Sequence, residues 1–188
     1  GVGGDEFQLD FEVDATNLLL NPNFDIALAG WVSGTPGNLA RDPEDSDLEA
    51  SSGSGTFLSN LTTAMTLGQC LTVTPGSLLV IGGVVRLDSL SATQPEIYAA
   101  AQFHSNALCS APLGSAQQTL AVAGDGGGIW EALPERSVAA PPGVQSVLFG
   151  LVVDDNATQN LQEVLFDSLY VRGRAPFFAD GFETGDSS

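Results

Sequence analysis

Short apolar runs bounded by turn-forming residues recur along the whole chain. No stretch of a dozen residues keeps the 3.6-residue apolar period of a helix. Turn residues such as Pro75-Gly76, Pro141-Pro142-Gly143 and Asp154-Asp155-Asn156 separate the runs instead. This pattern is typical of an all-β sandwich or barrel. It predicts strands at Phe7–Val13, Asn17–Leu20, Gly30–Ser33, Thr56–Leu61, Met65–Val73, Leu78–Leu87, Glu96–His104, Gln117–Ala123, Ile129–Leu133, Ser146–Val153 and Glu163–Val171.

The cleanest amphipathic strand lies near the N-terminus, where Phe7, Leu9, Phe11 and Val13 alternate with polar residues. Side chains two positions apart point to the same face of a strand, so this apolar face needs a cover. A neighbouring copy of the chain is one candidate, because an extended segment can complete a sheet edge of another molecule. A head-to-tail contact that does not close propagates as a filament. The alternative is that the segment folds back onto its own domain.

Residues 17–25, Asn-Leu-Leu-Leu-Asn-Pro-Asn-Phe-Asp, followed by Gly30-Trp31, resemble the opening of galactose-binding-like jelly rolls. These include carbohydrate-binding modules of the family 4/9/22 type. Ile129-Trp130-Glu131 and the final apolar segment Val164–Val171 also fit this resemblance, in the same order. It implies a two-sheet antiparallel β-sandwich in which Trp31 and Trp130 pack structurally.

Three segments follow from the resemblance. Residues 17–173 are expected to form the sandwich, and residues 1–16 precede the first strand of the family as an N-terminal extension and candidate donor strand. Residues 174–188 form a C-terminal tail, in which Asp180-Gly181-Phe182-Glu183 resembles a short terminal motif of many exported bacterial proteins.

Charge excludes several partners. The 188 residues contain 23 acidic side chains and five arginines but no lysine, for a net charge of −18. Nucleic acids and anionic membranes are bound by clustered Lys and Arg, so neither is an expected partner. The longest apolar run, Leu78–Val85, is far shorter than the roughly 20 residues that span a bilayer. No membrane span is predicted.

The two cysteines, Cys70 and Cys109, lack the Cys-x-x-Cys spacing of redox and zinc sites. The first residues, Gly-Val-Gly-Gly, are interpreted as a processed N-terminus, which favours a secreted protein at an extracellular or cell-surface location. In that setting two cysteines favour one disulfide, which would stabilise the fold by about 4 kcal/mol. Two separate buried thiols are the alternative.

Enzymatic chemistry is not predicted. The chain has a single histidine and no nucleophile elbow, His-Glu-x-x-His zinc motif or phosphate-binding loop. Two carboxylates at a fixed separation suffice for a glycosidase, but with 23 acids this signal has no specificity. The main hypothesis is therefore a non-catalytic, self-assembling structural subunit of an extracellular or surface filament, joined to copies of itself through the N-terminal strand.

The alternative function is a carbohydrate-binding module with a polysaccharide partner. Such a site needs aromatic platforms beside hydrogen-bonding groups. Tyr98, Phe103, His104 and Asn106 lie on or just after one predicted strand, where such modules often bind ligand. Tyr98 as a simple core residue remains equally open.

A structural Ca²⁺ site is the third candidate. Asp167 shares its parity with Leu165, Leu169 and Val171, which suggests that it points inward, and a buried carboxylate must be paired. The resemblance implies calcium between the first and last strands, with Asp25 and Asp167 at the acidic positions. Hydrogen bonds from backbone N–H groups are the alternative for Asp167. Pro43–Ser54 is acidic and then rich in Ser and Gly, which predicts a long surface loop. Loose calcium binding by its acidic residues is an alternative, but the tract from Asp42 to Glu49 lacks EF-hand spacing, which favours a solvated loop.

Overall fold

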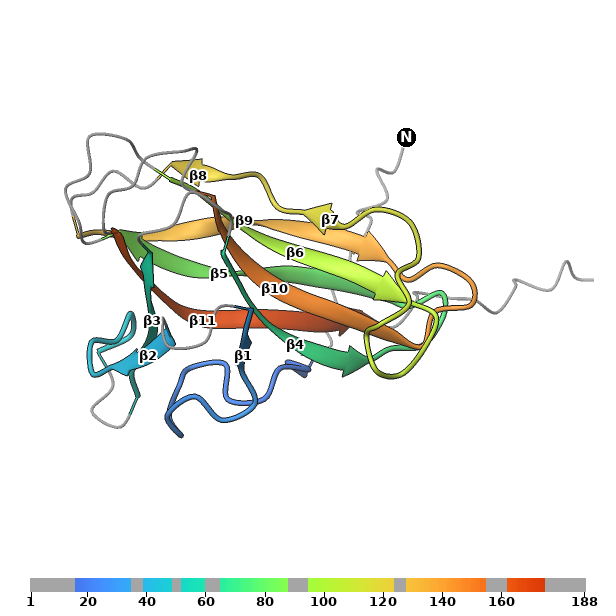
Figure 1. Ribbon diagram of the computed structural model, residues 1–188, viewed down its shortest axis with the longest axis horizontal. Coiled ribbons are helices and arrows are strands. Elements are labelled where there is room, and N and C mark those ends of the chain that lie inside the picture. The colour runs from blue at the N-terminus through green and yellow to red at the C-terminus, as the bar shows by residue number, and fades with distance from the viewer. Residues whose placement is uncertain are drawn as a thin grey trace, which may run out of the picture.

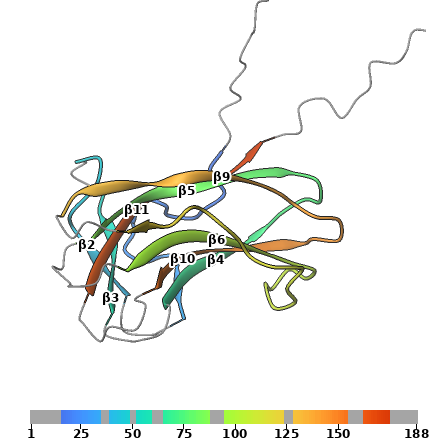
Figure 2. The same ribbon diagram turned by 90° about the horizontal axis from the view of Figure 1, so that it is seen from above.

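A computed structural model describes residues 16–34, 39–48, 52–59, 65–87, 95–123, 128–154 and 162–174. Within these ranges there is no helix, and eleven strands form two antiparallel sheets that pack face to face (Figures 1 and 2). The predicted two-sheet β-sandwich is therefore confirmed. The described part of the chain contains no helix long and apolar enough to cross a membrane.

The first sheet has the order β1-β4-β10-β6-β7, and the short β8 also pairs with β6. We call it the front sheet, because it faces the viewer in Figure 1. Its strands are β1 (Val32–Ser33), β4 (Met65–Thr72), β6 (Glu96–His104), β7 (Gln117–Gln118), β8 (Val122–Ala123) and β10 (Ser146–Asp154).

The second sheet has the order β2-β3-β11-β5-β9, and we call it the back sheet. Its strands are β2 (Leu39–Asp42), β3 (Ser54–Ser59), β5 (Leu78–Leu87), β9 (Trp130–Ala139) and β11 (Gln162–Arg174). The longest strand, β11, is also the last, and it pairs with β3 on one side and β5 on the other.

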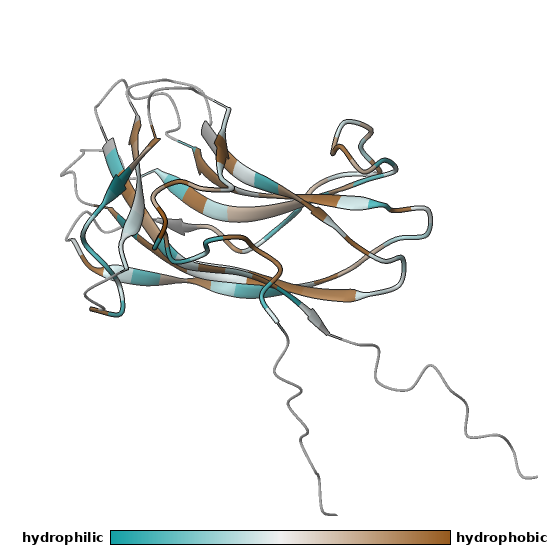
Figure 3. Ribbon diagram, turned by 90° about the horizontal axis from the view of Figure 1, so that it is seen from below, coloured by the Kyte–Doolittle hydropathy of each residue, from teal (hydrophilic) through white to brown (hydrophobic). Residues whose placement is uncertain are grey.

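The core lies between the two sheets. In β6 and β10 every second residue is buried between the layers, among them Ala99, Phe103, Phe149 and Leu151. Bands of hydrophobic residues accordingly recur along the strands of both sheets (Figure 3). Each fully buried large apolar side chain stabilises the fold by about 1.5–3 kcal/mol.

The family-like motif at residues 17–31 closes one side of the sandwich. The Asn17 side chain donates to Leu169 O at 2.8 Å and accepts from Val171 N at 3.0 Å, which ties the start of the domain to its last strand. The Asn21 backbone carbonyl accepts from Trp31 Nε1 at 3.0 Å. The buried Trp31 stacks on Phe24 at 5.3 Å between ring centroids. The structural role expected for Trp31 is confirmed.

Two predicted strands differ from the structure because a side chain takes the place of a backbone hydrogen-bond partner. Asn17–Leu20 makes only a single bridge, at Arg172, because the Asn17 side chain takes bonds that a strand backbone would make. Gln117–Ala123 splits into β7 and β8, because Thr119 Oγ1 rather than a backbone carbonyl accepts from Ala99 N at 3.1 Å.

Other boundaries also differ. The strand β2, at Leu39–Asp42, was not predicted, and β9 runs to Ala139 rather than ending at Leu133. Trp130 is half-buried and lies under the guanidinium of Arg86, 5.3 Å from the ring centroid, so its predicted core position was wrong.

The disulfide between Cys70 and Cys109 is present. It joins β4 to the loop that follows β6. The predicted strand Phe7–Val13 and the tail from residue 175 lie outside the described residues.

Candidate functional site

The outer face of the front sheet is the surface on which a site can be assembled. Strand pairing places its outward residues in rows that cross the strands. One row contains Tyr98 of β6 beside Val152 of β10, and a parallel row contains Gln102, Leu148 and Cys70. Leu148 is 39% exposed and Cys70 is also exposed, so the face is accessible at this second row, whereas Val152 beside Tyr98 is 8% exposed.

Between these two rows lies a row of residues without long side chains. Ala100 of β6 pairs with Gly150 of β10, and Gly150 pairs with Gly68 of β4. We call Gly68, Ala100 and Gly150 the small-residue row. A Cβ atom at Gly68 would lie 2.4 Å from Phe149 O, so this position excludes any larger residue. Two residues along a strand span roughly 7 Å, so the flanking rows stand about 14 Å apart.

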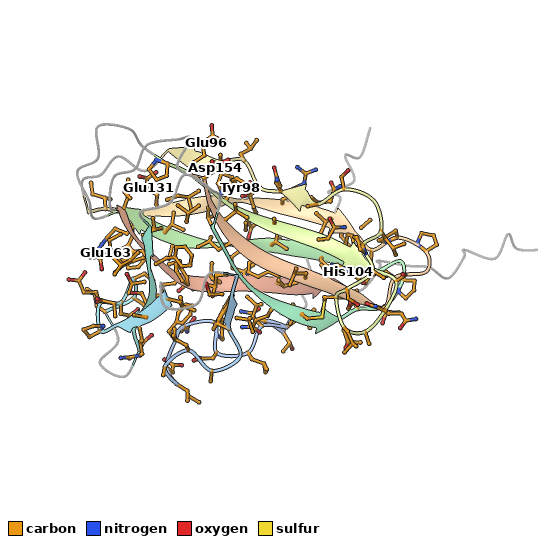
Figure 4. All side chains as sticks on the ribbon, viewed as in Figure 1. Glu96, Tyr98, His104, Glu131, Asp154 and Glu163 are labelled. Carbon is orange, nitrogen blue, oxygen red and sulfur yellow. A yellow bond between two sulfur atoms is a disulfide. The ribbon has the colours of Figure 1, made fainter. Side chains whose placement is uncertain are left out.

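Tyr98 stands at one side of the small-residue row, half-buried. Burial raises the pKa of its hydroxyl, the carboxylates of Asp154 and Glu96 raise it further, and a hydrogen bond with the Gln118 side chain lowers it. Glu96 and Asp154 face each other across the β6–β10 ladder (Figure 4). Tyr98 therefore keeps its proton at neutral pH and offers a ring, a hydroxyl and a neighbouring amide on one surface.

The other three residues predicted for this site are placed elsewhere. Phe103 is 4% exposed and belongs to the core between the sheets, on the opposite face of β6 from Tyr98. His104 shares the face of Tyr98 but is buried at the far end of the strand. Asn106 uses its side chain within its own loop, donating to Ser110 Oγ at 2.7 Å and accepting from Ser110 N at 3.1 Å. Of the four, only Tyr98 lies on the accessible face.

Sequence reasoning missed Gln118 and the small-residue row. Strand parity was a usable signal for the row, because Tyr98, Ala100 and Gln102 alternate with the apolar positions of the same strand. No local signal identifies Gln118, because its place beside Ala100 depends on how β7 pairs with β6.

The second candidate site lies on the outer face of the back sheet, at Asp167. Its carboxylate is fully buried and accepts from Ser46 N at 3.0 Å, Ser46 Oγ at 2.7 Å and Ser168 N at 2.6 Å. Burial raises the pKa of Asp167 to about 6, the bonds from Ser46 and Ser168 lower it, and the neighbouring Asp45 side chain raises it. The alternative expected for Asp167, hydrogen bonds from backbone N–H groups, is thus present.

The inward direction expected for Asp167 was wrong. A β-bulge between Asp167 and Tyr170 shifts the register of β11, and Ser168 there has a positive φ of 46°. Leu169 therefore faces the core while Asp167 faces outward, where residues 45–46 cover it. The burial of Asp45, 9% exposed, also corrects the prediction that this whole segment is solvated.

The residues around Asp167 provide only some of the ligands that a calcium ion requires. Asp45 and Asp167 are two adjacent buried carboxyl groups, a donor set that suits a hard cation. Asp25 is exposed, and the acid that the structure places beside Asp167 is Asp45, so a calcium site shared by Asp25 and Asp167 stays a prediction. In the part of the chain with described coordinates, no group of three or more His, Cys, Asp or Glu side chains is arranged to hold a metal.

Comparison with known proteins gives the fold. No family model and no curated protein matches the chain. Among solved structures, the module TmCBM61 in complex with beta-1,4-galactotriose aligns with a TM-score of 0.61 at 14% identity, covering 85% of this chain and 100% of that one. The CBM22-1 xylan-binding domain from Paenibacillus barcinonensis Xyn10C aligns with a TM-score of 0.59 at 18% identity, covering 85% and 96%.

A third structure, the enzymatically active domain of Bacteriophage CBA120 tailspike protein 4, aligns with a TM-score of 0.65 at 12% identity. The match covers 84% of this chain but only 21% of the tailspike chain. The described fold is thus the jelly-roll sandwich of carbohydrate-binding modules, as the sequence resemblance implied.

Proposed function

We propose that this chain is a non-catalytic carbohydrate-binding module that holds a polysaccharide on the outer face of its front sheet. The observation that carries the proposal is the small-residue row beside Tyr98, in which Ala100 and Gly150 are partly exposed and Gly68 is buried, with an aromatic ring along one side. A sugar chain can lie along this row while one ring stacks on Tyr98. Structures with this fold include one bound to galactotriose and one described as xylan-binding.

Charge selects the class of glycan. Glu96 and Asp154 lie on this face, and no described residue with an outward side chain on β4, β6 or β10 is Arg or Lys. Arg136 of β9 donates to Gln118 O at 2.6 Å and to Gln117 Oε1 at 2.8 Å at the edge of the sheet. A polymer of uronic acids would meet the like charge of Glu96 and Asp154, while Arg136, at the edge of the sheet, is held by Gln117 and Gln118. The expected ligand is therefore a neutral polysaccharide.

An extracellular location is consistent with this function. The Cys70–Cys109 disulfide is typical of proteins that fold in an oxidising compartment. A module that acts on polysaccharides works where these polymers lie, outside the cell.

Binding to neutral xylan, galactan and glucan, with polygalacturonate as the acidic comparison, tests the proposal by affinity electrophoresis and calorimetry. Tyr98→Ala should weaken binding tenfold or more, because it removes the stacking ring. Ala100→Leu should do the same by filling the small-residue row, without removing any hydrogen bond. The only other tyrosine, Tyr170, lies on the back sheet, so Tyr170→Ala is the matched control and should bind normally.

Equal affinity of the Tyr98→Ala, Ala100→Leu and Tyr170→Ala variants would reject the front sheet as the binding face. Failure of the wild-type chain to bind any neutral polysaccharide would reject the function itself.

The filament hypothesis stays a prediction. Its residues, Phe7, Leu9, Phe11 and Val13, lie outside the described part of the chain. The known structures that share the fold support carbohydrate binding rather than assembly.

A further inference from the structure

Strand β7 lies at the outer edge of the front sheet and is only two residues long. Its residues, Gln117 and Gln118, pair with Ala101 and Ala100 of β6. In the sheet order β7 comes last, so a strand pairs with it on one side only. A ladder this short, at the edge of a sheet, opens easily unless other contacts support it.

The two side chains of β7 point to opposite faces of the front sheet. Ala100 faces outward in the small-residue row, so its partner Gln118 also faces outward, and Gln118 is exposed. Ala101 is buried in the core, so Gln117 points into the space between the sheets and is half-buried. Gln118 is therefore the residue of β7 that a ligand on the front sheet can reach.

Gln118 stands at the end of the small-residue row and beside Tyr98. Tyr98 and Ala100 lie two positions apart on the same face of β6, and the Gln118 side chain hydrogen-bonds with the Tyr98 hydroxyl. Ligand sites combine aromatic surface with a few placed polar groups, side-chain amides among them. An amide has two donors and an acceptor, so Gln118 can bond to Tyr98 and to a sugar hydroxyl at the same time.

Arg136 of β9 fastens β7 from the opposite sheet. β9 is the edge strand of the back sheet on the same side of the sandwich as β7 (Figure 1). Arg136 pairs with the core residue Ile81, so its side chain points toward the front sheet. Its Nη1 donates to Gln118 O at 2.6 Å, and its Nη2 donates to Gln117 Oε1 at 2.8 Å. One guanidinium thus holds both residues of β7.

The bond from Arg136 to the Gln118 carbonyl takes the place of a neighbouring strand. Thr119, the next residue, donates its N–H to Ala99 O and accepts from Ala99 N with its hydroxyl. Alternate residues of an antiparallel strand bond to the same neighbour, so the Gln118 carbonyl points away from β6. The guanidinium is always charged and its N–H groups are fixed in a plane, which suits it to hold two acceptors in defined positions.

We propose that Gln118 contacts the bound sugar chain beside Tyr98, and that Arg136 is the positioning residue that holds Gln118 in place. Arg136 bonds to β7 from the inner side and the edge, so it acts through Gln118 rather than on the ligand. The contact rests on the proposed function, because it adds a residue to the same site. The attachment of β7 by Arg136 is testable without any carbohydrate.

Hydrogen exchange of the free protein measures this attachment. Arg136→Met keeps the apolar stem of the side chain and removes both bonds, so protection of the neighbouring Thr119 amide should fall about tenfold. Protection of the Leu113 amide, which bonds to β6 farther along the strand, should not change. Arg172→Met removes an exposed guanidinium from the outer face of the back sheet; it is the matched control and should change neither amide. Unchanged protection of Thr119 in Arg136→Met would overturn the role of Arg136.

A double-mutant cycle on binding of a neutral polysaccharide tests the contact. Gln118→Ala should weaken binding about tenfold, as loss of one hydrogen bond does, and Arg136→Met roughly threefold to fivefold. If Arg136 acts only through Gln118, the double variant should bind no more weakly than Gln118→Ala alone. Losses that multiply in the double variant would overturn the positioning role, and wild-type affinity of Gln118→Ala would overturn the contact.

The inference and the proposed function can fail separately. Weak binding by Tyr98→Ala together with full binding by Gln118→Ala would reject the inference and leave the front sheet as the binding face. Failure of the wild-type chain to bind any neutral polysaccharide would reject the function and the Gln118 contact together, and the exchange of the Thr119 amide would still decide whether Arg136 holds β7.

Discussion

Ser46 donates both its backbone N–H and its hydroxyl to the carboxylate of Asp167, at 3.0 and 2.7 Å, across 121 positions of sequence. These bonds hold the segment before β3 against the bulge of the last strand. Asp45, next to Ser46, is buried against the same carboxyl group. The outer face of the back sheet therefore contains two adjacent buried acids.

The protonation of this pair of acids should make the free energy of unfolding depend on pH. Because the pKa of Asp167 is raised to about 6 from 3.8, the folded chain keeps a proton between pH 4 and pH 6 that the unfolded chain has released. The free energy of unfolding contributed by this group therefore falls as pH rises through that window. Asp167→Asn removes the titration. The stability difference between wild type and variant should shrink by on the order of 2–3 kcal/mol from pH 4 to pH 7.

Urea denaturation at pH 4, 5, 6 and 7 measures this difference, in which contributions of the other acids cancel. Asp25→Asn, a change at an exposed acid of the same chain, is the control and should leave the profile unchanged. Parallel profiles for wild type and Asp167→Asn would mean that the Asp45–Asp167 pair does not hold the proton.

The sequence places calcium at Asp25 and Asp167, whereas the structure puts Asp45 beside Asp167, so we expect calcium to act on the Asp45–Asp167 pair. A divalent cation bound by Asp45 and Asp167 would replace the shared proton and stabilise the folded state in proportion to the logarithm of its concentration. At pH 7, millimolar CaCl₂ should raise the melting temperature of wild type by a few degrees and that of Asp167→Asn not at all. A melting temperature that is the same in chelator and in CaCl₂ would end the calcium hypothesis.

The sequence predicted the parts of the fold that short-range patterns encode. Short apolar runs bounded by turn residues predicted strands at β6 and β10, and Asn17 and Trp31 marked the motif that closes the sandwich. The candidate binding site was harder to predict from the sequence, because it depends on the pairing of strands that are distant in sequence. Nothing local places Gly68 beside Gly150 or Gln118 beside Ala100.

Errors at Phe103 and Asp167 have different physical origins. Phe103 was grouped with Tyr98 although an odd separation along a strand puts two side chains on opposite faces, so parity alone excluded it. Asp167 was assigned inward by correct parity counting, and the bulge at Ser168 reversed the result. A bulge adds a residue without a reliable mark in the sequence.

Removal of residues 1–16 tests the assembly hypothesis. The described core lies within residues 17–173, so the truncated chain should fold with an unchanged urea midpoint. If the N-terminal strand joins neighbouring copies, the full chain should sediment as concentration-dependent polymers and the truncated chain as a monomer. Salt should favour the polymer, because it screens acids that alternate with the apolar residues. Identical sedimentation of the two chains would exclude the donor strand.

Gly55 of β3 shows how closely the aromatic core constrains its neighbours. A Cβ atom at this position would lie 2.3 Å from Phe166 Cε2 and 3.0 Å from Phe24 Cε1. Phe166 cannot yield easily, because its ring already packs edge-on against Phe24 at 5.3 Å. Gly55→Ala should therefore lower the free energy of unfolding by about 1–3 kcal/mol through overpacking.

Gly173 of β11 provides the matched control, because a Cβ there meets nothing within 4 Å. Gly173→Ala should change the free energy of unfolding by no more than about 0.5 kcal/mol. Urea denaturation followed by near-ultraviolet circular dichroism measures both stability and the order of the aromatic cluster. Equal stability of the two variants would mean that the rings of Phe24 and Phe166 move aside at no cost. The core around residues 17–31 would then deform more easily than its packing implies, and it would not hold the edge of the sandwich next to β1 rigid.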